Sequence, residues 1–392
     1  MAPPACKGAA VAASSLWSKW AGRLRTLRRV LRPIAVHLPG LLGGVMAASG
    51  ARAVTLPEDS AEAMIHLYKG GGVTAWGPAL LVRKSLADKV SLSATYYVDA
   101  VSNASIDVVT TASPFKERRT EYGLSADYTV RDSLITLSTS SSREPDYDAS
   151  SMSIDVAQET FGGMTTVNLG FSRGEDLVGK KGTPGYFDSA IHWQYRLGVT
   201  QILTPSWLMS ANLEAISDSG FLGNAYRAAR VFGTTVPERN PRTRTSRALK
   251  LRTVGDLGSR DAVHAEYRYF WDTWAIKAHT IQGGYSRYFG DQWLGDAFVR
   301  VYSQSQANFY SDNATEQTTY ISRNKQLSNF NSLGLGAKIS YSWKRVPGQY
   351  EIKANGAYEL VRFNYKNFTD VRTGSKYAFT ANVLQLFVSA TF

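Results

Sequence analysis

Strict alternation of apolar and polar residues recurs along this chain from Glu62 to its last residue, and it limits the possible folds more than any other feature. In segment 191–199 every odd position is apolar or aromatic, whereas the even positions include His192 and Arg196. Segment 263–271 repeats the alternation. Because successive side chains of a β-strand point to opposite faces, each segment has one apolar and one polar face. The pattern therefore predicts an all-β chain.

The polar faces carry full charges, which cannot lie unpaired in a dry core. One apolar and one charged face per strand is typical of a barrel with lipid outside and a wet lumen inside. Both signs occur on neighbouring strands, so we expect cross-strand ion pairs and no clear ion selectivity. The residues predicted to point into the lumen are His192, Arg196, Glu214, Lys250, Arg252, His264, Glu266, Arg268, Asp296, Arg300, Glu351 and Lys353.

The carboxy-terminal segment 384–392 has apolar side chains on every even position and ends on Phe392. In outer-membrane barrels the last strand closes the sheet against the first and faces lipid. An aromatic last residue resembles the signal by which the barrel-assembly machinery recognises its clients. We therefore predict that Phe392 is an assembly signal.

The amino-terminal segment 1–53 holds eight Lys or Arg residues and no acid, followed by a short apolar run from Ile34 to Ala48 and the small-residue pattern Ala51-Arg52-Ala53. This arrangement is typical of a secretory signal peptide. A membrane anchor is the alternative, but the run is shorter than the roughly 20 residues that a spanning helix needs. We predict cleavage after Ala53, which leaves residues 54–392 as the barrel.

Removal of the signal peptide changes what the composition indicates. The formal charge of +12 comes from 44 bases and 32 acids, and without the eight bases of 1–53 it falls to about +4. The basic character therefore does not indicate a nucleic-acid partner. The single cysteine, Cys6, leaves with the signal peptide, so no disulfide framework remains.

Sixteen strand-like segments can be placed, separated alternately by short turns and longer connections, as in a transmembrane antiparallel up-and-down β-barrel. Fourteen or eighteen strands are alternatives, because the first strand and the region near residue 274 are weakly bounded. The longer connections are 101–119, 174–187, 218–245 and 307–325. The predicted strands are 62–69, 73–85, 90–100, 120–130, 133–143, 150–158, 164–173, 188–202, 207–217, 246–256, 262–273, 275–288, 292–306, 326–343, 350–365 and 377–392.

Tyr and Trp residues gather near the strand ends, where membrane barrels carry aromatic girdles. Cross-strand aromatic pairing in any sheet is the alternative. The residues concerned are Trp76, Tyr96, Tyr97, Trp193, Trp207, Trp271, Trp274, Trp293, Trp343, Tyr365 and Tyr377.

Candidate chemistry is sparse. The sequence contains no H-E-x-x-H, G-x-S-x-G or P-loop motif, so we predict no catalytic residue, no cofactor and no metal. Asp146 and Asp148 offer oxygens that suit Ca²⁺, although a solvated acidic loop explains them as well. Gly70-Gly71-Gly72 predicts a tight hairpin turn. The basic stretch 242–247 is either an attraction site for anionic solutes or lipopolysaccharide phosphates, or a solvated loop end.

A resemblance to a known family covers nearly all of residues 54–392. The block from Leu81 to Pro114, preceded by Gly70-Gly-Gly-Val-Thr74, resembles the amino-terminal hallmark of domain of unknown function 3570, a family of proteobacterial outer-membrane proteins. The resemblance implies an outer-membrane barrel without established activity or catalytic residues, in a periplasmic redox context. Further matches are Glu117 to Tyr122, Asp146 to Asp148, Leu169 to Arg173, Pro241 to Ser246, Asp272 to Trp274 and Phe309 to Asp312.

Three functions remain open for a barrel in the Gram-negative outer membrane, with outer-membrane lipid and lipopolysaccharide as its surroundings. The first is a porin-like channel for small solutes, since sixteen strands leave an interior that side chains do not fill. The second is a non-conducting scaffold that docks or sheathes a periplasmic or surface partner, such as a redox protein. The third is an outer-membrane enzyme, which would need a cluster of catalytic side chains at the rim. Conduction depends on whether loop 218–245 or 307–325 folds inward.

Overall fold

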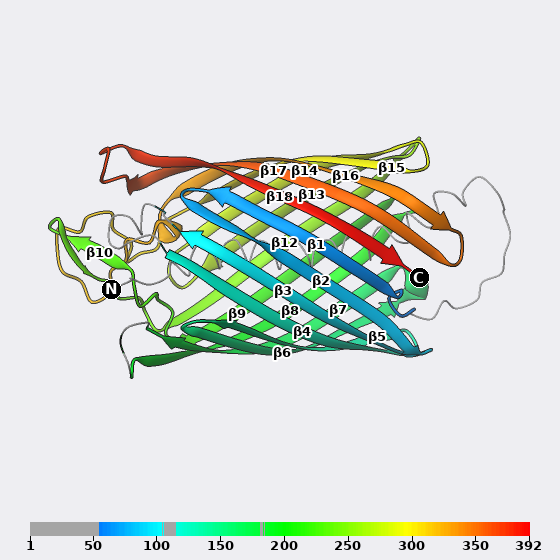
Figure 1. Ribbon diagram of the computed structural model, residues 1–392, viewed down its shortest axis with the longest axis horizontal. Coiled ribbons are helices and arrows are strands. Elements are labelled where there is room, and N and C mark those ends of the chain that lie inside the picture. Colours follow the sequence, from blue (N-terminus) through cyan, green and yellow to red (C-terminus); the bar gives the residue numbers. More distant parts are fainter. Residues whose placement is uncertain (1–54, 104, 106–114, 181–182, 184) are drawn as a thin grey trace.

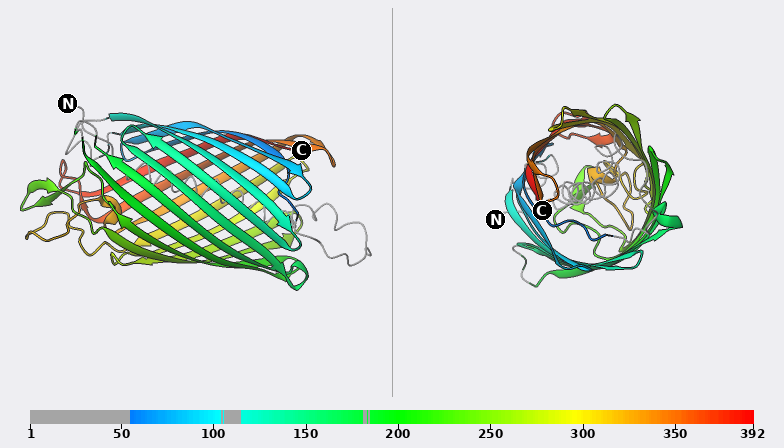
Figure 2. Two further views of the ribbon diagram at one scale, coloured as in Figure 1. Left: turned by 90° about the horizontal axis from the view of Figure 1, so that it is seen from below. Right: turned by 90° about the vertical axis from the view of Figure 1, so that its right-hand side faces the viewer.

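The strands form one closed sheet, which Figure 1 shows from the side as tilted strands and the right view of Figure 2 shows end-on as a ring. This computed structural model describes residues 55–392 apart from 104, 106–114, 181–182 and 184. The predicted signal peptide, 1–53, lies outside the described residues, and so does most of the predicted connection 101–119.

Every wall strand pairs antiparallel with both neighbours, and β1 closes the ring by pairing with β18 on one side and β2 on the other. A small separate hairpin is formed by β10 (Ala228–Val231) and β11 (Thr234–Pro237). The wall strands are β1 (Ser60–Gly70), β2 (Val73–Ala87), β3 (Val90–Asn103), β4 (Phe115–Val130), β5 (Ser133–Glu144), β6 (Tyr147–Thr160), β7 (Thr165–Gly179), β8 (Phe187–Thr204), β9 (Trp207–Gly220), β12 (Thr243–Gly258), β13 (Asp261–Asp272), β14 (Lys277–Phe289), β15 (Trp293–Gln304), β16 (Phe330–Val346), β17 (Tyr350–Thr369) and β18 (Lys376–Thr391).

The prediction of a sixteen-stranded up-and-down barrel is confirmed, and the alternatives of fourteen and eighteen strands are wrong. The hairpin β10–β11 was not predicted, because it lies inside the longest expected loop. The strand expected from residue 275 starts at Lys277, because the Asp272 carboxylate accepts the backbone N–H groups of Trp274 and Ile276 and closes a turn there. The strand expected from residue 326 starts at Phe330, after a short 3₁₀ turn over Lys325–Leu327.

Short turns lie at one end of the barrel and longer loops at the other, as predicted, and the two ends are visible in Figure 1 and in the left view of Figure 2. The carboxy terminus lies at the short-turn end. The hairpin turn expected at Gly70-Gly71-Gly72 joins β1 and β2, and the positive φ angles of Gly71 (58°) and Gly72 (81°) explain its glycines.

Strand register decides which side chains point into the barrel, because paired residues of adjacent strands point to the same face. The parity can be followed from strand to strand around the ring without conflict: Arg196 pairs with Gly170, and Gly170 pairs with Asp155. Large apolar side chains are exposed on the opposite face, among them Leu197 and Ile281. An apolar outside and a charged inside follow from the alternation.

The aromatic girdle was predicted in part correctly. Trp76, Trp207, Trp293 and Trp343 are exposed on the outward face. Three predicted girdle residues, Tyr97, Tyr365 and Tyr377, point inward instead, and Trp274 is buried under a loop. A place near a strand end does not decide the face, since parity does, and the loops bury rings against the inner wall.

The last residue lies where a terminal signal would be accessible. The backbone N–H of Phe392 donates to the carbonyl oxygen of Asp59 at 3.1 Å, and its ring is exposed at the short-turn end. Its role in assembly stays a prediction. No helix among the described residues is long and apolar enough to cross a membrane.

Candidate functional site

Every charged residue predicted for the lumen occupies an inward-facing position. The ion pairs that they form were expected between adjacent strands, and several instead join strands that are separated by a third. The pairs, with their N···O distances, are Arg196–Asp155 (2.8 Å), His264–Asp296 (3.0 Å), Arg300–Glu359 (2.7 Å), Arg268–Glu214 (3.5 Å), Lys250–Glu266 (3.4 Å) and Lys353–Glu351 (2.8 Å).

Glycines on the intervening strands lie beneath three of these longer pairs, whereas the pair of Arg268 and Glu214 crosses β12 at Ala248. Gly170 on β7 lies beneath the pair Arg196–Asp155, and a Cβ there would overlap the Asp155 carboxylate and approach Arg196 Nε to 2.7 Å. Gly334 on β16 lies in the same way beneath the pair of Arg300 and Glu359. An inward side chain on the middle strand would separate the two charges. Glycine at these positions therefore allows the two charged side chains to meet across the middle strand.

Charged side chains at mid-height of the lumen differ in exposure between its two sides. The side chains of Arg196 and Asp155 point inward at mid-height of β8 and β6, yet they are 35% and 42% exposed. On the other side, Arg300 and Glu359 are only 13% and 9% exposed. The lumen is therefore not filled uniformly, and the open part lies along the β6–β8 side.

The inward positions of β3 to β9 form an acidic wall. Towards the long-loop end this wall carries Asp99, Glu117, Glu121, Glu144, Asp176 and Asp218. From mid-height to the short-turn end it carries Asp155, Glu214, Asp127 and Glu159. The cationic groups at inward positions of these same strands are Arg119, Arg196 and, when protonated, His192, which lies between Asp176 (2.9 Å) and Asp218 (2.8 Å).

The inward positions of β12 to β17 are balanced in charge. Their carboxylates are Asp256, Glu266, Asp272, Asp296, Glu351 and Glu359. Their cations are Arg244, Lys250, Arg252, Arg268, Arg300, Lys338, Arg345 and Lys353. The lumen candidates taken from the sequence came mostly from this side, which is why the sequence indicated no preferred sign.

Sequence reasoning missed two buried polar groups near the closure of the barrel. His66 lies on β1, stacked on Tyr97, with Nε2 at 2.8 Å from the Asp99 carboxylate. Arg83 on β2 forms an ion pair with Asp127 on β4, and Thr136 donates to the same carboxylate at 2.6 Å. The partners are 33 and 44 residues apart, so no local motif could have indicated them.

An aromatic belt lines the inner wall of β15 to β18 near the long-loop end. It consists of Tyr302, Phe330, Phe363, Tyr365, Tyr377 and Phe379. Neighbouring rings are in contact, with centroids 5.0 Å apart for Phe330 and Tyr365 and 4.7 Å for Phe363 and Phe379. Contacts of this kind add stability beyond the apolar area that they bury.

The two loops whose inward folding the sequence left open join into one structure, which we call the loop cap, made of residues 221–242 and 305–329. Val231 bridges to Ala314 and Arg239 to Ile321, and their apolar side chains form a small core. Leu327 and Tyr310 of the cap pack against the aromatic belt. In the end-on view of Figure 2 the loops lie within the outline of the barrel. Part of segment 305–329 is therefore packed against the inner wall at the mouth, whereas Figure 1 places hairpin β10–β11 beyond the ends of the wall strands.

Arg323 holds the loop cap to the wall. Its guanidinium lies 4.4 Å from the centre of the Phe368 ring and donates to Asp312 and to the Thr369 carbonyl. Outside the strands, the hydrogen bond from Arg372, helped by the charge of Arg323, keeps the pKa of Asp370 below its ordinary value. Asp370 thus stays ionised beside the cap.

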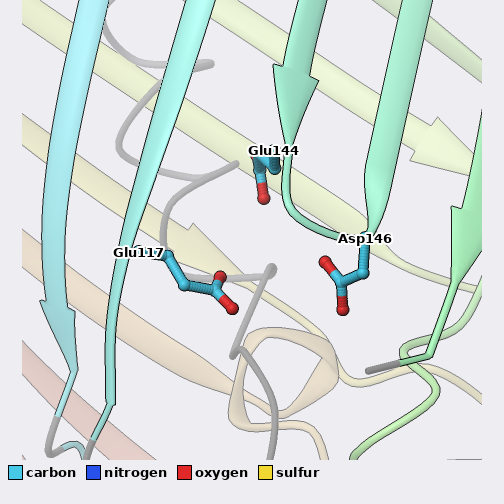
Figure 3. A group of neighbouring side chains, drawn as sticks. All are labelled: Glu117, Glu144 and Asp146. Atoms are coloured by element: carbon cyan, nitrogen blue, oxygen red, sulfur yellow. The ribbon is translucent and has the colours of Figure 1, made fainter. Parts of the chain in front are cut away.

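Three carboxylates meet at the rim of the acidic wall, as Figure 3 shows. Glu117 on β4, Glu144 at the end of β5 and Asp146 in the following turn bring oxygens within 4.8 Å of one another. Tyr226 of the loop cap donates to Asp146. The pair suggested by the sequence is separated, because Asp148 points outward and pairs with Arg143. Carboxylate oxygens suit hard cations, but nothing further here distinguishes a metal site from an acidic rim.

The basic stretch 242–247 is divided between different surroundings. Arg242 pairs with Asp188 at 2.7 Å, Arg244 points inward to Asp272, and Arg247 is exposed on the outward face. Arg247 belongs to a set of exposed outward cations at the long-loop end, here called the basic collar. The collar consists of Lys69, Lys116, Arg118, Arg247, Lys277 and Arg362, and none of them forms an ion pair within the described part of the chain.

A closed wall with an apolar outer face and a charged inner face defines a transmembrane antiparallel β-barrel of the up-and-down type. The chain belongs to the family described as protein of unknown function (DUF3570), which matches residues 101–360. The resemblance seen in the sequence is therefore confirmed. The comparison with curated protein sequences found no match.

Solved structures with a similar fold are distant. The siderophore receptor PirA from Pseudomonas aeruginosa has 10% identity and a TM-score of 0.45 over 85% of this chain and 62% of its own, so this chain spans less than two thirds of that receptor. The CymD monoaromatic hydrocarbon channel has 11% identity and a TM-score of 0.43, with 86% and 88% covered. A loop-deletion mutant of OmpT, an outer membrane protein of Vibrio cholerae, has 8% identity and a TM-score of 0.44, and the match covers 85% of this chain and 97% of that protein.

Proposed function

We propose that this protein is a passive channel for small hydrophilic solutes in the Gram-negative outer membrane, rather than an enzyme, with its long-loop end in the lipopolysaccharide leaflet. The observation that carries the proposal is the exposure of Arg196 and Asp155 at mid-height of the wall. Charged side chains that are open to water in the middle of a sixteen-stranded barrel indicate a continuous wet path.

The loop cap supports a channel of restricted width. The cap packs on the aromatic belt through Tyr310 and Leu327 and reaches the opposite rim through Tyr226. Hydrogen bonds and ion pairs fix it, so it narrows the mouth without depending on a bound partner. A restricted mouth favours small solutes over folded proteins.

Single-channel recording on the refolded protein, residues 54–392, in a planar bilayer tests the channel. We expect reproducible conductance steps. A barrel that is folded, as shown by its heat-modifiable migration on gels, yet produces no steps would contradict the channel and favour the scaffold that docks a partner. Addition of periplasmic extract to such a silent barrel would then be the next measurement.

The basic collar supports the orientation. Arg247 and Lys277 both pair in register with Trp271, so two exposed cations flank one aromatic ring at the membrane interface. Lipopolysaccharide phosphates are the anions available at that depth, and each Lys or Arg near an anionic membrane surface contributes about 1 kcal/mol.

The double variant Arg247→Gln, Lys277→Gln is expected to lose most of the thermal stabilisation that lipopolysaccharide gives to the refolded barrel. The measurement is the temperature of the heat-modifiable gel shift with and without lipopolysaccharide. The control is Arg287→Gln, Lys344→Gln, which removes two exposed outward cations at the short-turn end. An equal loss in both variants would argue against a collar specific to the long-loop end.

A further inference from the structure

The two sides of the lumen differ in charge, and this difference is a property of the tertiary structure. On the acidic wall of β3 to β9, carboxylates far outnumber Arg119 and Arg196, although Asp127 and Glu214 pair with Arg83 and Arg268 of other strands. On β12 to β17, carboxylates and cationic side chains are present in similar numbers, and most of them form ion pairs. Taken over the whole inward face, negative groups prevail.

The excess of negative charge lies where the lumen is open. The exposed pair of Arg196 and Asp155 belongs to the acidic wall, whereas the poorly exposed pair of Arg300 and Glu359 belongs to the balanced side. Solutes that cross the barrel therefore pass the carboxylates. A narrow water path with low-dielectric walls concentrates the field of such groups.

The outward face has the opposite sign. Its charges at the long-loop end are those of the basic collar, with Arg143 and Arg173 paired to the two outward acids Asp148 and Glu175. The cations of the basic collar are thus placed outside the conduction path. The cations of the loop cap are also engaged: Arg323 binds Asp312, Arg239 donates to the Thr318 carbonyl, and Arg227 donates to Asn324.

Resting on the proposed channel, we infer that its substrates are cations, namely inorganic cations and small organic cations that carry ammonium or guanidinium groups. The solvent-exposed carboxylates of the acidic wall attract such solutes and lower the local concentration of anions. Rings of carboxylates in other pores act on the same principle.

The reversal potential across a bilayer with a KCl gradient tests this inference. We expect the reversal potential to shift from zero toward the equilibrium potential of K⁺. The K⁺/Cl⁻ permeability ratio should decline as salt rises from about 0.1 M to about 1 M, because the screening length shrinks from about 10 Å to about 3 Å. A conducting barrel with no preference, or with a preference for Cl⁻, would overturn the cation assignment alone. A silent barrel would overturn the channel itself.

Isosteric neutralisation tests the source of the preference. In the triple variant Glu117→Gln, Glu144→Gln, Glu159→Gln the permeability ratio is expected to fall by about twofold or more, because three inward charges are lost at both ends of the acidic wall. Glu175→Gln is the control, since it removes an outward carboxylate next to Asp176 on the same strand. An unchanged ratio in the triple variant, with folding verified by heat-modifiable migration, would overturn the role of the wall.

Discussion

Replacement of Arg83 by methionine is expected to lower the free energy of unfolding by about 3–5 kcal/mol, the usual cost when one partner of a buried ion pair is lost. The Asp127 side chain is fully buried and that of Arg83 is 11% exposed. Without the guanidinium, the carboxylate would keep only the hydrogen bond from Thr136. Urea unfolding of the refolded barrel in lipid vesicles, followed by tryptophan fluorescence, measures the change.

The neighbouring residue provides a matched control. Lys84 points outward, is 60% exposed and pairs with Asp59 at 2.6 Å. Exposed pairs of this kind contribute at most about 1 kcal/mol, so Lys84→Met should have a small effect. Equal losses for Arg83→Met and Lys84→Met would show that the inward pair is no more important than a surface pair. The double variant Arg83→Met, Asp127→Leu should recover much of the loss, since no buried charge remains.

Removal of one half of the loop cap is the second change with a large expected effect. Gln304 and Phe330 are register partners, so a two-residue Asn-Gly turn can replace residues 305–329 without disturbing β15 and β16. Single-channel conductance is expected to rise by about twofold or more, because the packing on the aromatic belt is lost and the mouth widens. The belt would then face water.

A loop variant outside the cap serves as the reference for that experiment. Arg372→Gln breaks an exposed pair with Asp370 but leaves Arg323 and its contacts in place. Its conductance should match that of the unchanged protein. If the shortened barrel also conducts as before, the cap does not limit ion flow, and the narrowest point must lie deeper in the lumen.

Local pattern was sufficient for the barrel wall. The strand expected at 207–217 is found as Trp207–Gly220, and the strand expected at 133–143 is found as Ser133–Glu144. Strands of this kind are predictable because the face of each residue depends only on whether its number is odd or even. The same parity placed Arg196 and Glu214 inward before any contact was known.

Contacts between distant segments were beyond the reach of the pattern. Trp274 was expected in the membrane girdle, yet its indole N–H donates to the Thr243 carbonyl at 3.0 Å beneath the loop cap. The hairpin β10–β11 was hidden in a segment whose strands are only four residues long. Neither feature leaves a periodic pattern in the sequence, because both depend on contacts that the two loops make in the folded protein.

Alternation by itself predicted a barrel of about sixteen strands and indicated which charged side chains face its lumen, while the exact strand number came from the closed sheet. Only the tertiary structure decided which charges meet and where the lumen stays open. Arg300 and Glu359 are 59 residues apart and meet over Gly334, because the closed sheet curves their strands toward each other. Parity is local to each strand, whereas charge balance across a lumen depends on the order of strands around the ring, and this order brings the acidic strands together on one side.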